Sequence, residues 1–248
     1  TKYFCLSSIK RGEYLSTVSI QELVDAGFHF GHRTSKWNPK MKPFIFGKRN
    51  LIHIIDLRET VKGLVTACKF LTNLVRTNKD VLFVGTKWQA REIAERESQR
   101  CGMHYVSERW LGGTLTNFDT IRKRLKRLEE LENMEKTGAI NQFSKKAISS
   151  FNRERKKILS NLKGIRNMAT LPGALVVVDP KHEHIAISEA RKLGIPTVCL
   201  ADTDCDPDLI DICVPGNDDA IRSINLFFTK ASDAIMAGKE SKLATAKV

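Results

Sequence analysis

Residues Pro172 to Leu200 read PGALVVVDPKHEHIAISEARKLGIPTVCL and contain a strand, a helix and a second strand in succession. The apolar run Leu175–Val178 is bounded by proline and glycine before it and by aspartate after it, as is typical of a buried strand. The apolar residues of Glu183–Leu193 have helical spacing, and Thr197–Leu200 is a second short apolar run. Two buried strands joined by a helix predict a parallel pair with the helix packed on one face of the sheet.

The same alternation of short apolar strands and amphipathic helices continues along most of the chain. We expect further strands at Leu51–Leu57, Val81–Val84, His104–Val106 and Asp211–Val214, and further helices at Arg58–Arg76, Gln89–Arg100 and Asp218–Ala234. A capping-box pattern at Ser19–Glu22 predicts a short additional helix that ends at Gly27. The whole pattern predicts an α/β fold, a mostly parallel sheet flanked by helices on both faces.

Residues 121–166 interrupt this alternation with two narrow apolar stripes, which are separated near Gly138 and Asn141 and surrounded by charged residues. Such stripes predict an antiparallel helical hairpin that is inserted between strands and projects from the core. An ordinary pair of helices covering the sheet is the alternative. The predicted organisation is a flexible N-terminal extension (1–18), a single α/β domain (19–120 and 167–238), the inserted basic hairpin (121–166) and a C-terminal tail (239–248).

Positive charge is concentrated in two segments of the chain. The 248 residues include 41 Lys and Arg against 28 Asp and Glu, a net charge of +13. Residues 29–49 carry +6 and residues 121–166 carry +9, whereas residues 167–248 carry −4. This asymmetry favours a polyanion partner, because each cation that neutralises a phosphate releases condensed counterions. The alternative is a basic surface that serves solubility alone.

The first basic segment, Gly31–Arg49, reads GHRTSKWNPKMKPFIFGKR and combines six cations with two prolines and three aromatic rings. The prolines disfavour a regular helix, the cations can pair with phosphates, and exposed rings can stack on unpaired bases. The segment therefore predicts an extended, RNA-contacting arm. The alternative is that the rings anchor a loop to the core, and we prefer this interpretation for Phe44 and Phe46.

No motif predicts a catalytic or cofactor site. Val84–Lys87 (VGTK) lies between a strand and a helix, where phosphate loops occur, but it has only one of the two glycines of a Walker loop. No G-x-G-x-x-G fingerprint of dinucleotide binding follows any strand. The six histidines show no nucleophile at a recognisable triad spacing.

Two groups of side chains contain residue types that can bind metals. The first consists of Cys199, Cys205, Cys213, His182 and His184. It contains no close pair of zinc ligands, and we expect the cysteines to be reduced packing residues. The second is the alternating aspartates of Asp202–Asp208, where Pro207 replaces the glycine that a calcium loop requires. We favour turn and capping roles for them and predict no metal; a magnesium-dependent hydrolase acting at Asp179 and Asp202 is the alternative function.

The sequence also bears on location. No stretch approaches the roughly 18 consecutive apolar residues of a membrane helix. No secretory signal is visible at the N-terminal end, so the protein is expected to stay inside the cell or organelle.

Seven runs carry a resemblance to a known family. They are AGFHFGHRTSKWNPKMKPFIFGKRN (Ala26–Asn50), HIIDL (His53–Leu57), FVGTK (Phe83–Lys87), RWLGGTLTNF (Arg109–Phe118), HEHIAISEA (His182–Ala190), GIPT (Gly194–Thr197) and PGNDDAIRSI (Pro215–Ile224). In this order, over about Val18 to Gly238, they resemble the bacterial and organellar small-subunit ribosomal protein S-two family.

The resemblance implies a flavodoxin-like (Rossmann-like) domain with a protruding coiled-coil hairpin and no enzymatic activity. It implies a structural role in the small ribosomal subunit, in subunit assembly and in translation. The implied partners are small-subunit ribosomal RNA, neighbouring small-subunit proteins and, in bacteria, the messenger-binding ribosomal protein S-one, without a membrane. The implied compartment is the bacterial cytoplasm or an organellar stroma or matrix.

The expected RNA-binding residues lie in the arm, in the Arg109–Asn117 turn and on the hairpin. They are Arg33, Lys36, Trp37, Asn38, Lys40, Lys42, Lys48, Arg49, Arg109, Thr116, Asn117, Arg122, Lys123, Lys126, Arg153, Lys156 and Lys157. Residues 1–17 and the end of the chain depart from the family pattern. The sequence therefore does not distinguish a bacterial from an organellar ribosome. A standalone RNA-binding regulator is the third candidate function.

Overall fold

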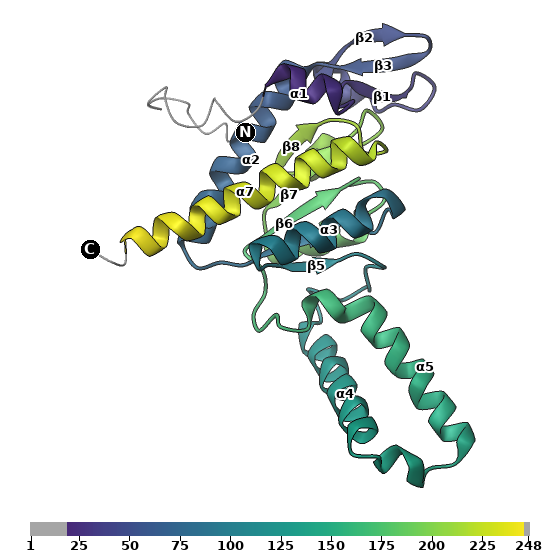
Figure 1. Cartoon of the computed structure of the whole chain (residues 1–248). Coiled ribbons are helices and arrows are strands. Elements are labelled where there is room, and N and C mark those ends of the chain that lie inside the picture. The colour runs from purple at the N-terminus through teal and green to yellow at the C-terminus, as the bar shows by residue number, and fades with distance from the viewer. Residues whose placement is uncertain (1–18, 246–248) are drawn as a thin grey trace.

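A five-stranded parallel sheet lies at the centre of the computed structural model, which describes residues 19–245 (Figure 1). In order across the sheet, the strands are β5 (His104–Val106), β4 (Val81–Val84), β6 (Ala174–Val178), β7 (Thr197–Ala201) and β8 (Ile212–Pro215). Each lies within one residue of its prediction. The chain runs outward from β4 to β5 and then crosses back to β6, so the fold is doubly wound and Rossmann-like, with its switch point between β4 and β6.

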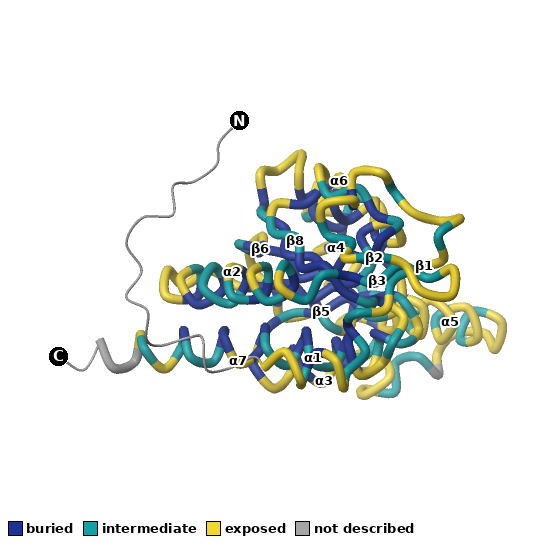
Figure 2. The backbone as a smooth tube through the Cα atoms, turned by 90° about the horizontal axis from the view of Figure 1, so that it is seen from above, coloured by how far each residue is buried: buried dark blue, intermediate teal, exposed yellow. Residues whose placement is uncertain are grey.

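Helices cover both faces of this sheet, as predicted. They are α2 (Leu57–Arg76), α3 (Trp88–Cys101), α6 (His184–Leu193) and α7 (Ile221–Thr245). Helices α2, α3 and α7 pack with Phe83 and Val176 on one face, and α6 packs with Leu82 and Val177 on the other. Successive strand residues point to opposite faces, which is why these strands are apolar at every position. Figure 2 shows the strands as the buried centre of the molecule.

A second, smaller sheet lies beyond one end of the main sheet (Figure 1). It is antiparallel, with the order β1 (Phe30–Arg33), β3 (Ile52–Ile55), β2 (Ile45–Arg49). Segment Leu51–Leu57, predicted as one more strand of the buried kind, supplies β3 instead, and of its strand residues only Ile55 is fully buried. The predicted strand is therefore present, but its expected burial was wrong, because a short isoleucine-rich run gives no information about which strands it pairs with.

The arm is also more structured than predicted. Between β1 and β2, residues Pro39–Phe44 form the short 3-10 helix η1, with proline at its first position and the Asn38 side chain accepting a hydrogen bond from the backbone N–H of Lys40. An extended arm was therefore the wrong expectation for these six residues. Proline excludes a long α-helix, but it is compatible with the first turn of a short one.

Two helices project from the edge of the main sheet near β5: α4 (Phe118–Lys136) and α5 (Lys145–Leu162), joined by η2 (Ala139–Gln142) (Figure 1). Their apolar stripes pack together near the sheet and continue into the core cluster of its second face. The next turn, η3 (Lys163–Ile165), fixes the pair to β5, because a Cβ at Gly164 would lie 2.2 Å from the carbonyl oxygen of Tyr105. The base of the pair thus belongs to the core, whereas its outer part extends away from the sheet.

The two ends of the domain match the predictions unequally. Helix α1 (Ile20–Asp25) begins at the predicted cap, where Ser19 Oγ accepts a hydrogen bond from the backbone N–H of Glu22. At the other end α7 continues through Thr245, where a tail was predicted from residue 239, and Lys239 Nζ donates to the carbonyl oxygen of Cys101. The predicted N-terminal extension, residues 1–18, lies outside the described residues.

Candidate nucleic-acid interface

Ion pairs and hydrogen bonds attach the arm to the loop that follows β7. The backbone N–H of His32 donates to Asp202 Oδ1 over 3.1 Å, and His32 Nδ1 lies 2.8 Å from Asp202 Oδ2. The backbone N–H of Asn38 donates to the carbonyl oxygen of Thr203 over 2.8 Å. Gly31 fits only because it has no side chain, since a Cβ there would lie 2.7 Å from Thr203 Cγ2. The base of the arm is therefore held in a defined position on the α/β domain.

Most predicted cations of the arm are available to a ligand. Arg33, Lys36, Lys42, Lys48 and Arg49 are all exposed, and none forms an ion pair with another described residue. Lys40 is different, because its Nζ lies 2.8 Å from Asp206 Oδ2 and 2.6 Å from Asp208 Oδ2. Lys40 is thus partly neutralised within the chain, and it is a weaker candidate for phosphate contact than sequence alone indicated.

The aromatic side chains of the arm divide into three environments. Trp37 is 38% exposed, and its ring centroid lies 5.3 Å from that of His53. Phe44 is half-buried, consistent with an anchor, but Phe46 is 77% exposed, so the preferred anchoring role for Phe46 was wrong. On a strand, alternate residues point to opposite faces, and Phe46 occupies the outward position of β2.

The second surface is the turn Arg109–Asn117, which is folded around one buried carboxylate, that of Glu189 on α6. Five donors converge on its two oxygens: Trp110 Nε1, the backbone N–H groups of Gly113, Leu115 and Thr116, and the Thr116 hydroxyl, at 2.8–3.2 Å. Burial raises the pKa of Glu189, but these hydrogen bonds outweigh burial and lower it overall. The carboxylate stays ionised and fixes the turn.

This arrangement leaves Arg109, Thr116 and Asn117 exposed, as predicted for a contact surface, while Trp110 is buried. Thr116 has a structural task as well, because its hydroxyl donates to Glu189. Sequence reasoning missed Glu189 itself. The available signal was a glutamate in the middle of an otherwise apolar helix face, which is unusual unless the carboxylate has partners.

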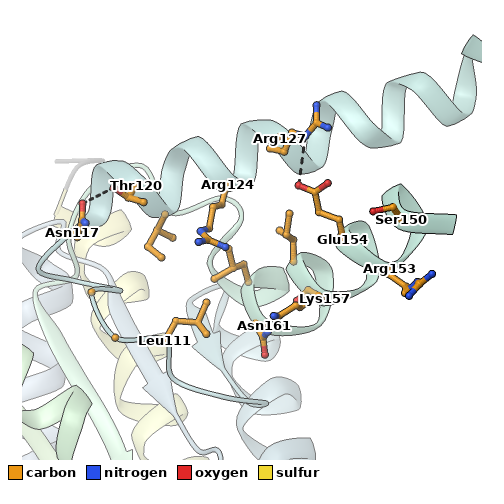
Figure 3. A pocket seen from close by; sticks show the side chains of 15 residues that line it. Leu111, Asn117, Thr120, Arg124, Arg127, Ser150, Arg153, Glu154, Lys157 and Asn161 are labelled. Carbon is orange, nitrogen blue, oxygen red and sulfur yellow. Dashed lines mark hydrogen bonds and ion pairs between the residues drawn. The ribbon is translucent and has the colours of Figure 1, made fainter. Parts of the chain in front are cut away.

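The third surface is the helical pair. Arg122, Lys123, Lys126, Arg153, Lys156 and Lys157 are all exposed, but they do not form one surface. Lys157 lines a groove between the two helices, and Lys126 and Lys156 do not. By the helical period, both lie away from the apolar stripes through which α4 and α5 pack. Arg122 is partly occupied, since its Nη1 donates to the carbonyl oxygen of Ala169. Arg124, which was not predicted, lines the same groove as Lys157 (Figure 3).

Side chains also gather at the carboxyl ends of the parallel strands, where ligands of doubly wound folds bind. Lys87 follows β4, and its Nζ forms ion pairs with three carboxylates. It lies 2.8 Å from Asp218 Oδ1, 2.6 Å from Asp219 Oδ1 and 3.4 Å from Asp179 Oδ2. The pKa of Lys87 is lowered by burial but is raised overall by these carboxylates. The VGTK segment, which fails as a phosphate loop, therefore supplies a cation that neutralises aspartates.

The two candidate hydrolase residues, Asp179 and Asp202, do lie at this edge. Ligand atoms of His32, Asp202 and Asp218 fall within 4.8 Å of one another, as do those of Asp179, Cys205 and Asp218, so either set is close enough to hold a cation. The hydrogen bond with Asp202 raises the pKa of His32 to about 9, so a protonated histidine already compensates one carboxylate. The cysteine and histidine group considered and rejected as a zinc site does not form either set, and the five described cysteines are free.

The remaining aspartates of this region match the preferred interpretation. Asp206 caps the short helix η4 (Pro207–Leu209) by accepting from the backbone N–H of Asp208. Asp204 pairs with Lys181 at 2.8 Å. Capping and pairing thus account for both without a metal.

The fold and these surfaces define a basic α/β protein with separate exposed cationic surfaces, on a Rossmann-like domain without nucleotide-binding glycines. The model of the family "Ribosomal protein S2" matches residues 23–238. The chain belongs to the ribosomal protein S2 family.

Curated relatives agree with this assignment. The small ribosomal subunit protein uS2 of Rhodopirellula baltica is 56% identical over 220 residues, which cover 89% of this chain and 85% of the relative. The protein of the same name from Syntrophobacter fumaroxidans is 55% identical over 225 residues (91% and 82%), and that from Geotalea uraniireducens is 50% identical over 228 residues (92% and 89%). Within residues 19–245, no helix has the length and apolar character needed to cross a membrane.

Proposed function

We propose that this chain is a structural constituent of the small ribosomal subunit, where it binds small-subunit ribosomal RNA and supports subunit assembly and translation. The observation that carries the proposal is the family match over residues 23–238, with relatives named as small ribosomal subunit proteins over most of their length. Members of this family are structural proteins, so the chain is not an enzyme. The strand-end aspartates are accordingly assigned to the stability of the domain.

The arm, the Arg109–Asn117 turn and the helical pair are the proposed RNA surfaces. The exposed arm cations without ion-pair partners in residues 19–245 support phosphate contact, because a cation already paired within the chain gains less from phosphate. Arg109 and Asn117 stand on a turn that Glu189 fixes in place. A turn whose backbone is already fixed loses little conformational freedom on binding, which favours affinity.

Several finer features belong to the same proposal. The helical pair is a coiled-coil hairpin that grips the RNA beside the α/β domain. Neighbouring small-subunit proteins contact the remaining surface and, in a bacterial ribosome, the messenger-binding protein S-one docks with help from this chain. The exposed Phe30 and Phe46 of the small sheet support a protein contact there, since large apolar side chains are enriched in interfaces. The compartment is the bacterial cytoplasm or an organellar stroma or matrix.

Sedimentation of an extract from cells that produce the tagged full-length chain tests the proposal. We expect the chain to migrate with small subunits and to remain bound in moderate salt. A variant with Lys42, Lys48 and Arg49 changed to Ala should dissociate at lower salt, because fewer phosphate contacts remain. A free pool of wild-type chain that never joins small subunits would contradict the proposal, and it would favour a standalone RNA-binding regulator.

A further inference from the structure

A groove of about 860 Å³ opens between α4 and α5 where the two helices leave the domain (Figure 3). One wall is formed by Asn117, the residue that caps α4, and by Thr120, Arg124 and Arg127 of α4. The opposite wall includes Ser150, Glu154, Lys157 and Asn161 of α5. Both sets of residues have the three- and four-residue spacing of one helix face. The volume is in the range of small-molecule pockets, roughly 300–1,000 Å³.

The groove carries positive charge that the chain itself does not neutralise. Arg127 is paired with Glu130 and Glu154, at 3.0 and 3.6 Å. Arg124 and Lys157 have no carboxylate partner among residues 19–245, and Arg124 points from α4 toward α5. The outer part of the pair, residues 132–150, contributes only +1 of the +9 between residues 121 and 166. The charge of the helical pair is therefore concentrated in its inner part, and four of the cations there line the groove: Arg124, Arg127, Arg153 and Lys157.

The floor of the groove is apolar, which a site for phosphate alone does not require. Leu111, Ile121, Ile158 and Leu162 form it, and the last three are more than 90% buried. Two amides stand at its edge. Asn117 Oδ1 accepts from Thr120, and Asn161 Nδ2 donates to the Lys157 carbonyl, so the Asn117 NH₂ group and Asn161 Oδ1 keep hydrogen-bonding capacity.

The end of the groove is formed by Gly112 and Gly113 of the turn that Glu189 fixes. At Gly112 a Cβ would meet no atom within 4 Å, and the backbone there is outside the left-handed region. The backbone at this position would therefore accept a side chain without strain, and because Gly112 lines the groove, a bulky side chain there is expected to narrow it.

We propose that this groove binds one unpaired nucleotide of small-subunit ribosomal RNA, with the base on the apolar floor, its edge at the two amides, and its phosphate between Arg124 and Lys157. An apolar floor under free cations matches a base attached to a phosphate. The edge of a duplex, whose bases are stacked inside, would leave the floor empty. The inference rests on the proposed function and specifies what part of the RNA the helical pair recognises.

Chemical probing of the complete small-subunit ribosomal RNA, free and with the full-length chain bound, tests this inference. The probe is dimethyl sulfate with a carbodiimide, which together report the pairing edges of unpaired bases. We expect at least one unpaired base to be protected by the wild-type chain. The protection should disappear with Gly112→Leu, which is expected to narrow the groove without changing charge, and with Arg124→Glu combined with Lys157→Glu.

The matched control is Lys126→Glu with Lys156→Glu, the same charge change on the outward faces of the same two helices. Each charge variant removes two cations. In both, the slope of log K for RNA binding against log salt concentration should therefore become shallower by about 1.5, since each phosphate contact contributes about 0.7–0.9. Only the groove variant should expose the protected base. Gly112→Leu should expose it with the salt dependence unchanged, whereas Gly112→Ala should keep the protection.

Three outcomes would overturn the inference. Protection that survives Gly112→Leu in a variant with wild-type thermal unfolding would show that the base lies elsewhere. Equal exposure in the groove and control variants would show an unspecific effect of charge. Unchanged probing with reduced incorporation into small subunits would assign the groove to a neighbouring protein. If the wild-type chain binds no ribosomal RNA, the proposed function fails as well, which distinguishes that failure from the others.

Discussion

Two buried carboxylates, Glu189 on α6 and Asp218 between β8 and α7, have opposite surroundings. Glu189 is 6% exposed and receives five hydrogen bonds, which lower its pKa. Asp218 is 1% exposed, and only its Oδ1 has a partner, Lys87. Burial, with Asp179 and Asp202 adding to it, raises the pKa of Asp218 to about 7, against the opposing effect of Lys87.

The contrast shows that burial alone does not decide what a carboxylate does. Donors that converge on Glu189 make its charge part of the structure of a loop. A carboxylate with other aspartates beside it keeps its charge less easily, and at the strand edge protonation competes with the cations His32 and Lys87. The Arg109–Asn117 turn is thus held by a carboxylate that stays charged near neutral pH, and the strand edge is the part whose charge responds to pH.

The largest effect is expected from Glu189→Ala. The substitution leaves three backbone N–H groups and the Trp110 indole without their acceptor in a buried place, so the free energy of unfolding should fall by about 3–5 kcal/mol. Glu189→Gln keeps the shape and one acceptor and should lose about half as much. Urea unfolding followed by circular dichroism measures both. Equal, small losses would show that the turn folds without the carboxylate.

The next effect is the response of stability to pH. The folded pKa values of Asp218, about 7, and His32, about 9, lie above their unfolded values of about 3.9 and 6.5. The folded chain binds more protons between each pair of values, so the free energy of unfolding should fall as pH rises, from about 4 to 7 through Asp218 and from about 6.5 to 9 through His32. The decrease in the free energy of unfolding that is due to His32 should amount to about 1–3 kcal/mol.

Urea unfolding between about pH 3 and pH 9.5, with a chelator present, measures this response. His32→Asn should remove the decline above pH 6.5 and leave the decline below it. The Glu189 carboxylate, whose pKa is lowered, should have the opposite sign: its contribution is complete above about pH 4.3 and is lost as pH falls further. A wild-type profile that rises toward pH 9 would contradict the assignment of His32.

A smaller effect is expected from Asp218→Asn. The amide oxygen can still accept from Lys87, and the substitution removes one negative charge beside Asp179 and Asp202. The free energy of unfolding at pH 7 should change by no more than about 1 kcal/mol, and above pH 7 the variant should be the more stable protein. If the free energy of unfolding fell as much as it does in Glu189→Ala, the two carboxylates would be equally important for stability, and the contrast drawn between them would be wrong.

The smallest effect is expected from Lys40→Ala, which tests carboxylates at the surface rather than in the interior. Solvent screens the contacts of Lys40 with Asp206 and Asp208, so unfolding should be unchanged within error. Because Lys40 is occupied within the chain, its removal should also change the salt dependence of RNA binding less than Lys42→Ala, which should flatten log K against log salt by about 0.7–0.9 units. Equal changes in slope would show that Lys40 leaves its aspartates for phosphate.

The candidate surfaces could be located from the sequence, but their composition could not. Charge density predicts that the arm and residues 121–166 face a polyanion, and most of the predicted cations are exposed. It does not distinguish Lys40, which pairs with Asp206 in a loop 166 residues away, from Lys42, which has no such partner in residues 19–245. Nor does it separate Arg124, in the groove, from Lys126 on the outer face.

The sequence by itself determined the main sheet, the helices that cover it and the family, because strand and helix periodicity and runs such as WNPKMKPFIFG are local properties of the chain. Only the tertiary structure decided that β3 leaves the main sheet, that Glu189 organises a turn more than 70 residues away, and that α4 and α5 enclose a groove. The physical reason is that these features depend on long-range pairing of hydrogen-bond donors, charges and surfaces. Local sequence supplies the partners, and the fold chooses among them.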